Sequence, residues 1–333
     1  MTPIGLPAIG VNIASSVIAA PLYGLVFEGA PPEASDLQLR HMTFADWLEL
    51  EDSDMVLDPR IAEDFATHEH VAVIASADAQ AGGDSPPLAE RFRAFRLRMP
   101  ALVSALRLTR PGNLVDPWIT AVYAQAPSRL GEFGTPPGVH AEVRREVFMY
   151  RQTFFGRSVV NGMRLDAAGW SAALAWLRRI EALLERHGPA LNPLIALFCK
   201  AFPSCVPSPY AELGPFAGQF LLLETLLGRV EREHRGQSFV ARAAAAAAQG
   251  GLDGAAARQL LERRAVPLRH QVLHGAGREA LRSADGVLDD LLALTRSIFA
   301  AYLLWLGRAG SRLSLPEERR AFDDACAQAA SSV

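Results

Sequence analysis

The sequence predicts an α+β protein in which a mixed α/β N-terminal domain is followed by an all-helical bundle. Short apolar runs of strand type alternate with turns in the first half of the chain. From Asp166 onward, apolar residues recur at the three- and four-residue spacing of helices. The chain has 333 residues, more than one hydrophobic core usually serves, which favours separate domains. We expect a sensing or regulatory α/β domain at 1–164, connecting helices at 165–204 and a helical domain at 205–333.

The composition is that of a folded protein whose overall charge does not favour binding to nucleic acid. Hydrophobic residues make up 50% and charged residues 21% of the chain, a balance that favours a buried core over disorder. The formal net charge of −3 gives no broad basic surface, so any nucleic-acid contact must be local.

The cysteines and histidines do not predict a metal site. Cys199, Cys205 and Cys326 form an odd set without the spacing of a zinc site or a disulfide framework. His68-Glu69-His70 lacks further ligands, so we expect ordinary surface histidines there. A cytoplasmic protein without metal or other cofactor is predicted.

The uncharged opening at 1–27 predicts strands and turns rather than a targeting or membrane segment. It has no positively charged start and is interrupted by Pro7 and Pro21, too early for the ~20 apolar residues of a spanning helix. We expect no membrane contact. Further strands are expected at 70–75, 118–124 and 144–155, and a helix at 89–108 that Pro100 kinks.

The second half predicts a series of amphipathic helices, the first of which carries Trp170, Leu177 and Ile180 on one stripe. Ser238 and Asp253 are placed to cap two later helices. Alanines at 243–248 favour a helix that packs closely. The other expected helices are 215–233, 239–249, 253–264, a segment opened by Pro267, 279–306, and a last helix opened by the capping-box pattern Ser314-Leu315-Pro316-Glu317.

Three motifs follow one another within these helices. They are Leu223-Glu224-Thr225-Leu226-Leu227, then Phe239-Val240-Ala241-Arg242-Ala243-Ala244, then Leu268-Arg269-His270-Gln271-Val272-Leu273-His274-Gly275. In this order and spacing they resemble the Apea-like branch of the HEPN superfamily, with its LExLL run, its FxxRAA helix and its signature R-x-x-x-x-H before a glycine. The resemblance covers residues 205–333 and implies an all-helical HEPN-like bundle.

The resemblance also implies an activity. Such domains include metal-independent endoribonucleases that work as homodimers, with two R-x-x-x-x-H segments facing each other across a cleft. Arg269 and His274 are then the catalytic residues, with His270 orienting the substrate or the catalytic histidine. A toxin or antiviral defence effector is implied, together with a partner that triggers or inhibits it. The RNA is expected to be single-stranded or looped.

Both residue types suit RNA cleavage. The unperturbed pKa of a histidine is near ~6.5, so His274 can accept a proton from a ribose 2′-OH or return one to the leaving 5′-oxygen. Arg269 stays protonated and presents a planar fork to phosphate oxygens. Residues five apart on a regular helix are separated by about 7.5 Å along the axis and about 140° around it. Arg269 and His274 of one copy therefore do not converge, and a two-fold dimer would complete the site.

The charge around these motifs is locally favourable. Between Arg229 and Arg282 arginines outnumber acidic residues, although the whole chain is slightly acidic. Such a domain would attract RNA. The same arginines also suit a solvated helical surface with balanced ion pairs.

Each motif residue also has a structural interpretation. Arg269 suits an ion pair at a helix start, and His274 suits a helix end before Gly275. Glu224 lies near the apolar stripe of its helix, where an unpaired carboxylate is costly, so we expect it to pair with Arg242. The alternative function is a non-catalytic HEPN module for dimerisation, nucleotide binding or protein interaction.

Overall fold

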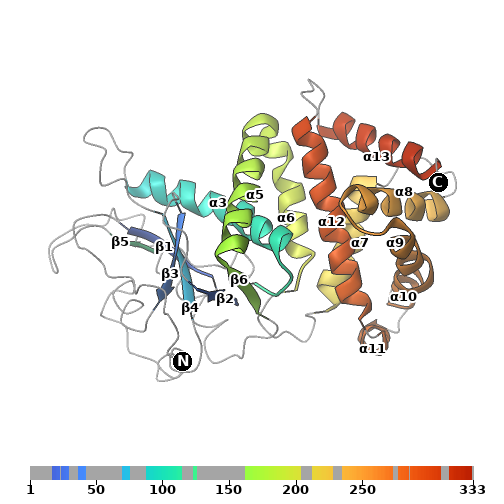
Figure 1. Ribbon diagram of the computed structural model, residues 1–333, viewed down its shortest axis with the longest axis horizontal. Coiled ribbons are helices and arrows are strands. Elements are labelled where there is room, and N and C mark those ends of the chain that lie inside the picture. The colour runs from blue at the N-terminus through green and yellow to red at the C-terminus, as the bar shows by residue number, and fades with distance from the viewer. Residues whose placement is uncertain are drawn as a thin grey trace. The chain divides into compact units, whose positions relative to one another are not determined.

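The computed structural model describes the chain in twelve segments, which fall into two compact units (Figure 1). The described residues are 17–22, 24–29, 37–42, 70–75, 88–114, 123–125, 162–203, 212–227, 235–272, 277–284, 286–308 and 315–331. The first unit comprises Met1–Val103, Thr109–Leu174 and Ser204–Pro207, and the second comprises Ser104–Leu108, Ala175–Pro203 and Ser208–Val333.

The first unit contains a four-stranded antiparallel sheet, in the order β3-β4-β1-β5. Its strands are β1 Val17–Pro21, β3 Leu37–Met42, β4 His70–Ala75 and β5 Tyr123–Gln125. Leu37 and Leu39 are fully buried and Gln38 between them is half-buried, as the alternating faces of a strand require. The predicted strand at 70–75 is confirmed, and β5 overlaps the end of the run predicted at 118–124. The strand predicted at 144–155 lies outside the described residues.

A second, parallel pair joins β2 Leu25–Glu28 to β6 Met163–Asp166. Gly112 lies against this pair with φ of +129°, and a β-carbon there would collide with the backbone of Met163. Asp166 ends β6 and accepts a hydrogen bond from the amide of Gly169 at 2.6 Å, which lowers the pKa of its carboxyl group. The switch from strand to helix therefore occurs at Asp166, as predicted.

Two long helices contribute residues to both units: α3 Leu88–Thr109 and α5 Ala167–His187. The helix predicted at 89–108 is confirmed, with Pro100 inside it. The stripe predicted on the other helix is also confirmed, because Trp170, Leu177 and Ile180 are all fully buried.

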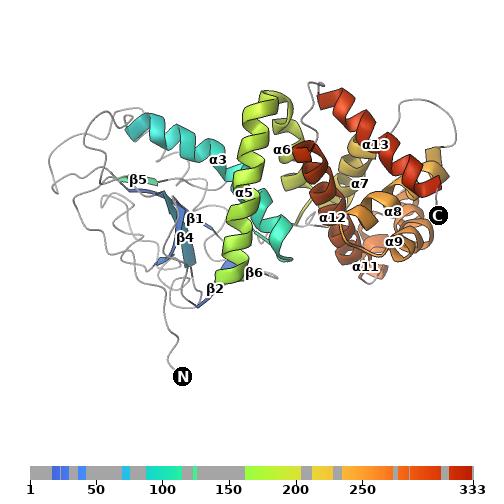
Figure 2. The same ribbon diagram turned by 45° about the horizontal axis from the view of Figure 1, so that its top comes forward.

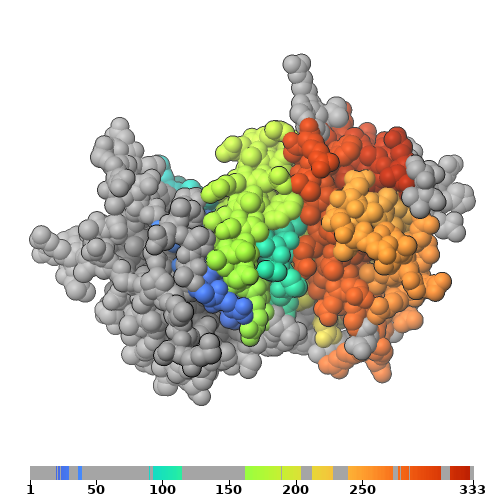
Figure 3. Space-filling model, viewed as in Figure 1, coloured from blue at the N-terminus to red at the C-terminus, as the bar shows by residue number. Residues whose placement is uncertain are grey.

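The second unit is entirely helical in its described parts. Its helices after α5 are α6 Asn192–Lys200, α7 Leu213–Leu227, α8 Arg235–Gln249, α9 Gly254–Leu260, α10 Val266–Gln271, α11 Gly277–Ser283, α12 Val287–Arg308 and α13 Leu315–Ser331. The long α12 contacts α7, α8, α9 and α13, and α13 also packs on α7 and α8 (Figure 2). In the space-filling view, α12 lies beside α8 and α9 on one face of this unit (Figure 3).

The helical core extends beyond residues 205–333. Phe198 of α6 stacks on Phe299 of α12 with ring centroids 4.2 Å apart. Gln219 of α7 donates a buried hydrogen bond to the carbonyl of Ala201. Residues 175–203 thus belong to the same compact unit as the helices that follow them.

The alanine-rich α8 packs closely, as predicted. Ala243, Ala246 and Ala247 are fully buried, and Ser297 of α12 donates a hydrogen bond to the carbonyl of Ala247 at 3.1 Å. Gly250 follows α8 so close to Ser297 that a β-carbon would overlap it. Small side chains therefore set the distance between α8 and α12.

Two predicted helix boundaries are wrong. Ser238 does not cap α8, because the helix begins at Arg235. The single helix predicted at 279–306 is two helices, since α11 ends at Ser283 and α12 begins only at Val287. Gly286 separates them with φ of +68°, a conformation that favours glycine. The cap predicted for Asp253 is confirmed: its carboxylate accepts from the amides of Ala255 and Ala256, the second and third residues of α9.

Candidate functional site

The segment that carries the R-x-x-x-x-H motif is preceded by a widened helical turn. Leu261–Ala265 form a π-helix between α9 and α10, with the amide of Val266 bonded to the carbonyl of Leu261, five residues earlier. Pro267 explains the widening, because a proline ring clashes with the carbonyl four residues before it in a regular helix. A π turn inserts one residue into the helix and rotates everything after it. The orientation of α10 therefore depends on this turn.

Arg269 of α10 is held against α7. Its Nη1 donates to Glu224 Oε1 at 2.5 Å, and its guanidinium lies over the ring of Phe220, 5.0 Å from the centroid. Phe220 and Glu224 are four residues apart on α7, so they lie on one face of that helix. Two independent contacts thus fix the direction of one arginine.

This arginine remains accessible. The side chain of Arg269 is 34% exposed and that of Glu224 is 41% exposed. A guanidinium carries five N–H donors, of which the bond to Glu224 uses one from Nη1. The arrangement is that of a positioned, half-exposed cation that can meet a phosphate.

The two histidines of the motif are placed differently. His270 is exposed on α10, next to Arg269 in the sequence. His274 lies outside the described residues, which stop at Val272 and resume at Gly277. The described residues thus include the predicted arginine and the supporting histidine but not the predicted catalytic histidine.

Arg242 has a structural role, and its predicted pairing with Glu224 is wrong. It is buried, and its Nε lies 2.5 Å from Asp323 Oδ1 of α13. Its Nη2 also donates to the carbonyl of Leu227 at 2.7 Å. Arg242 therefore ties the end of α7 and α13 to α8, while Glu224 pairs with Arg269 instead.

Two partners in these contacts were not foreseen from the sequence. Phe220 could have been found, because it stands one turn before Glu224 on the same helix. Asp323 carries no local signal, since its relation to Arg242 arises only when α13 packs on α8. Ion pairs between distant segments require the packing itself.

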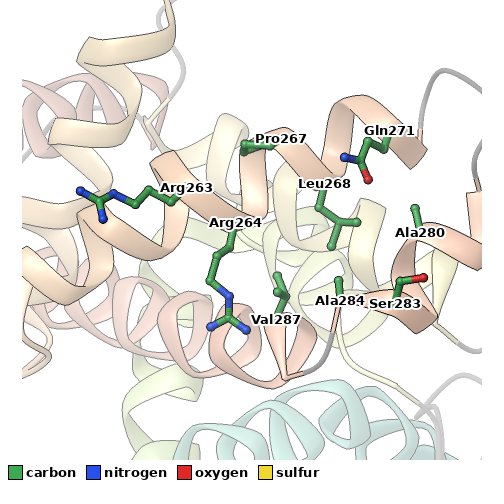
Figure 4. Close-up of a pocket in the computed structure, with 9 residues that line it drawn as sticks. All are labelled: Arg263, Arg264, Pro267, Leu268, Gln271, Ala280, Ser283, Ala284 and Val287. Carbon is green, nitrogen blue, oxygen red and sulfur yellow. The ribbon is translucent and has the colours of Figure 1, made fainter.

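A groove lies on another face of α10, between it and α11 (Figure 4). Its volume is about 360 Å³. Leu268 and Val287 form a buried floor, and Ala280 of α11 and Ala284 just after it contribute small side chains to one wall. The polar residues that line it are Arg263, Arg264, Gln271 and Ser283.

The first unit has a pocket of about 400 Å³ whose charges are already balanced. Arg164 pairs with Glu28 at 2.8 Å, and Arg110 pairs with Asp166 at 3.5 Å. All four side chains line this pocket, so it offers no excess charge to a ligand.

Among the described helices, none is both long and apolar enough to cross a membrane. Across the described segments, no cluster of three or more His, Cys, Asp or Glu side chains is arranged to hold a metal ion.

Comparison with known proteins gives no match: no family model, no curated protein and no solved structure is similar to this chain.

Proposed function

We propose that this protein is a metal-independent endoribonuclease of HEPN type, with Arg269 and His274 as its catalytic residues. The observation that carries the proposal is the placement of Arg269, which Glu224 and Phe220 hold at the surface of α10 with its guanidinium partly exposed. It stands five residues before His274 in the motif. A fixed cation and a titratable imidazole are the two groups that metal-free RNA cleavage requires.

The reaction needs one proton acceptor, one proton donor and one cation. His274 takes the proton of a ribose 2′-OH, and the 2′-oxygen forms a bond to the adjacent phosphorus as the bond to the 5′-oxygen breaks. The leaving 5′-oxygen receives a proton, from the imidazolium so formed or from the histidine of the partner copy in its protonated, imidazolium form. Arg269 stabilises the negative charge that builds up on the phosphate. The products are a 2′,3′-cyclic phosphate and a 5′-hydroxyl.

A homodimer would supply the missing geometry, since residues five apart on one helix point in different directions. We propose that two copies pair through the helical unit and bring their motifs together. The biological role that fits is a toxin or antiviral effector acting on single-stranded or looped RNA in the cytoplasm. A partner that blocks the cleft, or a trigger that opens it, would then regulate the nuclease activity.

The experiment is RNA cleavage by purified protein in EDTA, with transfer RNA and mixed cellular RNA as substrates. Wild type is compared with Arg269→Ala, His274→Ala and the control Arg258→Ala, which removes an exposed arginine of α9. We expect cleavage by the wild type and the control, and losses of about 100-fold or more for the two motif variants, the usual scale for general acid–base groups. Cleavage by a folded, dimeric His274→Ala variant at the wild-type rate would contradict the proposal.

The second candidate is a non-catalytic HEPN module, and the ion pair itself favours it. Glu224 neutralises Arg269, as it would if the arginine served only to join α10 to α7. This candidate predicts a folded dimer that leaves every RNA intact even in large excess over substrate. RNA cleavage that depends on His274 would exclude it.

A further inference from the structure

We infer that the groove between α10 and α11 binds one nucleotide of a single-stranded RNA substrate, beside the phosphate that is cut. The inference rests on the proposed ribonuclease function and names the place where the strand next to the cut is held. It begins from the shape of the groove, which is formed by the helix that carries Arg269 and by the next helix along the chain.

The size of the groove suits a nucleoside. Pockets for small organic ligands usually hold roughly 300–1,000 Å³, and this groove measures about 360 Å³. Ala280 and Ala284 contribute only methyl groups to one wall, which leaves room for a flat ring beside the largely buried Leu268 and Val287 (Figure 4). An RNA base has apolar faces and a polar edge, and single-stranded RNA leaves both accessible.

The polar groups are arranged at the two ends of the groove. Gln271 lies at the end of α10 and Ser283 at the end of α11, both on the side away from Arg263 (Figure 4). The amide of Gln271 can bond the edge of a base, and the hydroxyl of Ser283, which donates to the carbonyl of Glu279 at 2.8 Å, can still accept a bond. Arg263 lies toward the opposite end, is exposed, and extends outward beyond the groove (Figure 4). A strand that leaves the groove there would place its next phosphate near this guanidinium.

Arg264 contributes less to phosphate binding. Its Nη1 donates to Asp290 Oδ2 at 2.7 Å, so its charge is already balanced by a carboxylate. The two neighbouring arginines therefore have different roles. Arg263 is the group whose removal should change RNA binding.

The position of the groove along the chain connects it with the catalytic motif. Pro267, Leu268 and Gln271 line the groove, and Gln271 stands between Arg269 and His274 in the sequence. The groove and the guanidinium of Arg269 lie on different faces of α10. Leu268 faces the groove, whereas Arg269 points to Glu224 of α7. A strand crossing α10 would thus place one nucleotide in the groove and a neighbouring phosphate at Arg269.

Binding of a short, fluorescein-labelled 2′-O-methyl oligouridylate to the full-length protein tests this inference. The probe has no free 2′-OH and cannot be cleaved, so anisotropy measures binding alone. Arg263→Ala removes the proposed phosphate contact, and Ala284→Leu fills the groove without changing charge. The matched controls are Arg258→Ala on α9 and Ala293→Leu on α12, both at exposed positions outside the groove.

We expect Arg263→Ala to reduce the slope of log affinity against log salt by about 0.7, the value for one phosphate on a single strand. Ala284→Leu should weaken binding about tenfold while leaving the salt slope unchanged, because the larger side chain occupies the space of the base and carries no charge. Both controls should bind as the wild type does. Wild-type affinity and salt slope in both groove variants would overturn the inference.

Two further measurements, competition by mononucleotides and RNA cleavage by the groove variants, distinguish an RNA-binding groove from a mononucleotide site and from a groove that RNA does not use. Displacement of the probe by adenosine or uridine monophosphate at equal affinity would make the groove a mononucleotide site and overturn the assignment to an RNA strand. Cleavage of RNA by the groove variants at the wild-type kcat/KM would contradict nucleotide binding in the groove but not the proposed nuclease activity. Groove-dependent binding of the probe without RNA cleavage by the wild type would support the groove and contradict the nuclease.

Discussion

The side chain of Arg269 is oriented by two contacts, an ion pair with the carboxylate of Glu224 and the ring of Phe220. An ion pair between half-exposed side chains contributes only about 0–1 kcal/mol to stability, because solvent screens the charges. The exposures of 34% and 41% place this pair in that class. Its main consequence is therefore the orientation of the guanidinium, and its loss should affect catalysis more than folding.

Glu224→Gln tests this role. We expect kcat/KM for RNA cleavage to fall about tenfold or more, because Arg269 loses the partner that orients it, while the melting temperature stays nearly unchanged. Glu28→Gln is the matched control, since it removes an exposed ion pair with Arg164 at 2.8 Å in the other unit. Faster cleavage by Glu224→Gln would instead mean that the carboxylate competes with the substrate phosphate for Arg269.

Asp323→Asn tests the structural role of Arg242. The substitution leaves a buried guanidinium without its carboxylate, and breaking a buried pair in this way costs about 3–5 kcal/mol. Urea unfolding followed by circular dichroism should show this loss. Asp290→Asn, which breaks the half-exposed pair with Arg264, should cost at most about 1 kcal/mol. Equal stabilities of the two variants would contradict the assignment.

Among the elements, the π turn before α10 has the most direct link to the site. Pro267→Ala removes the ring that requires the turn, so the helix can return to the regular spacing. Loss of one inserted residue would rotate α10 by about 100° and move Arg269 away from Glu224. We expect cleavage to fall sharply while the helix content measured by circular dichroism remains. Full activity of this variant would show that the turn does not set the direction of Arg269.

The contact between α8 and α12 provides a second test at this scale. Gly250→Ala places a methyl group against Ser297 and should destabilise the protein by about 1–3 kcal/mol, as overpacking does. Gly307→Ala is the control, because a β-carbon at this helical position meets nothing within 4 Å. It should stabilise the protein by about 0.4–1 kcal/mol. Thermal unfolding of the two variants should therefore shift in opposite directions.

The elements that the sequence predicted well are those with strong local signals. Period-two and helical patterns located β4, α3 and α5, and the side chain of Asp253 identified a helix start. The break between α11 and α12 had a signal in Asp285-Gly286, but the continuous apolar stripe on both sides outweighed it. The π turn also had a local signal in Pro267, but a proline fits the first turn of a new helix equally well. The early start of α8 at Arg235 had no such signal.

At the scale of the whole molecule, the sequence predicted the change from a sheet-containing unit to a helical one but not where the helical core begins. Phe198 and Ala201 join α12 and α7 through side-chain contacts between distant segments. The contacts of the candidate site likewise depend on packing between distant segments. The motif identified Arg269, whereas its contacts with Glu224 and Phe220 follow only from the packing of α10 on α7.

The proposed function depends on one chemical step, the attack of a 2′-OH on the adjacent phosphate in RNA bound to the helical unit. The most direct test is mass spectrometry of the ends produced from a synthetic single-stranded RNA by the purified 333-residue protein in EDTA. We expect 2′,3′-cyclic phosphate and 5′-hydroxyl ends, and no cleavage where the 2′-OH at the cut site is methylated. Ends with a 3′-hydroxyl and a 5′-phosphate, or cleavage beside a methylated ribose, would contradict it.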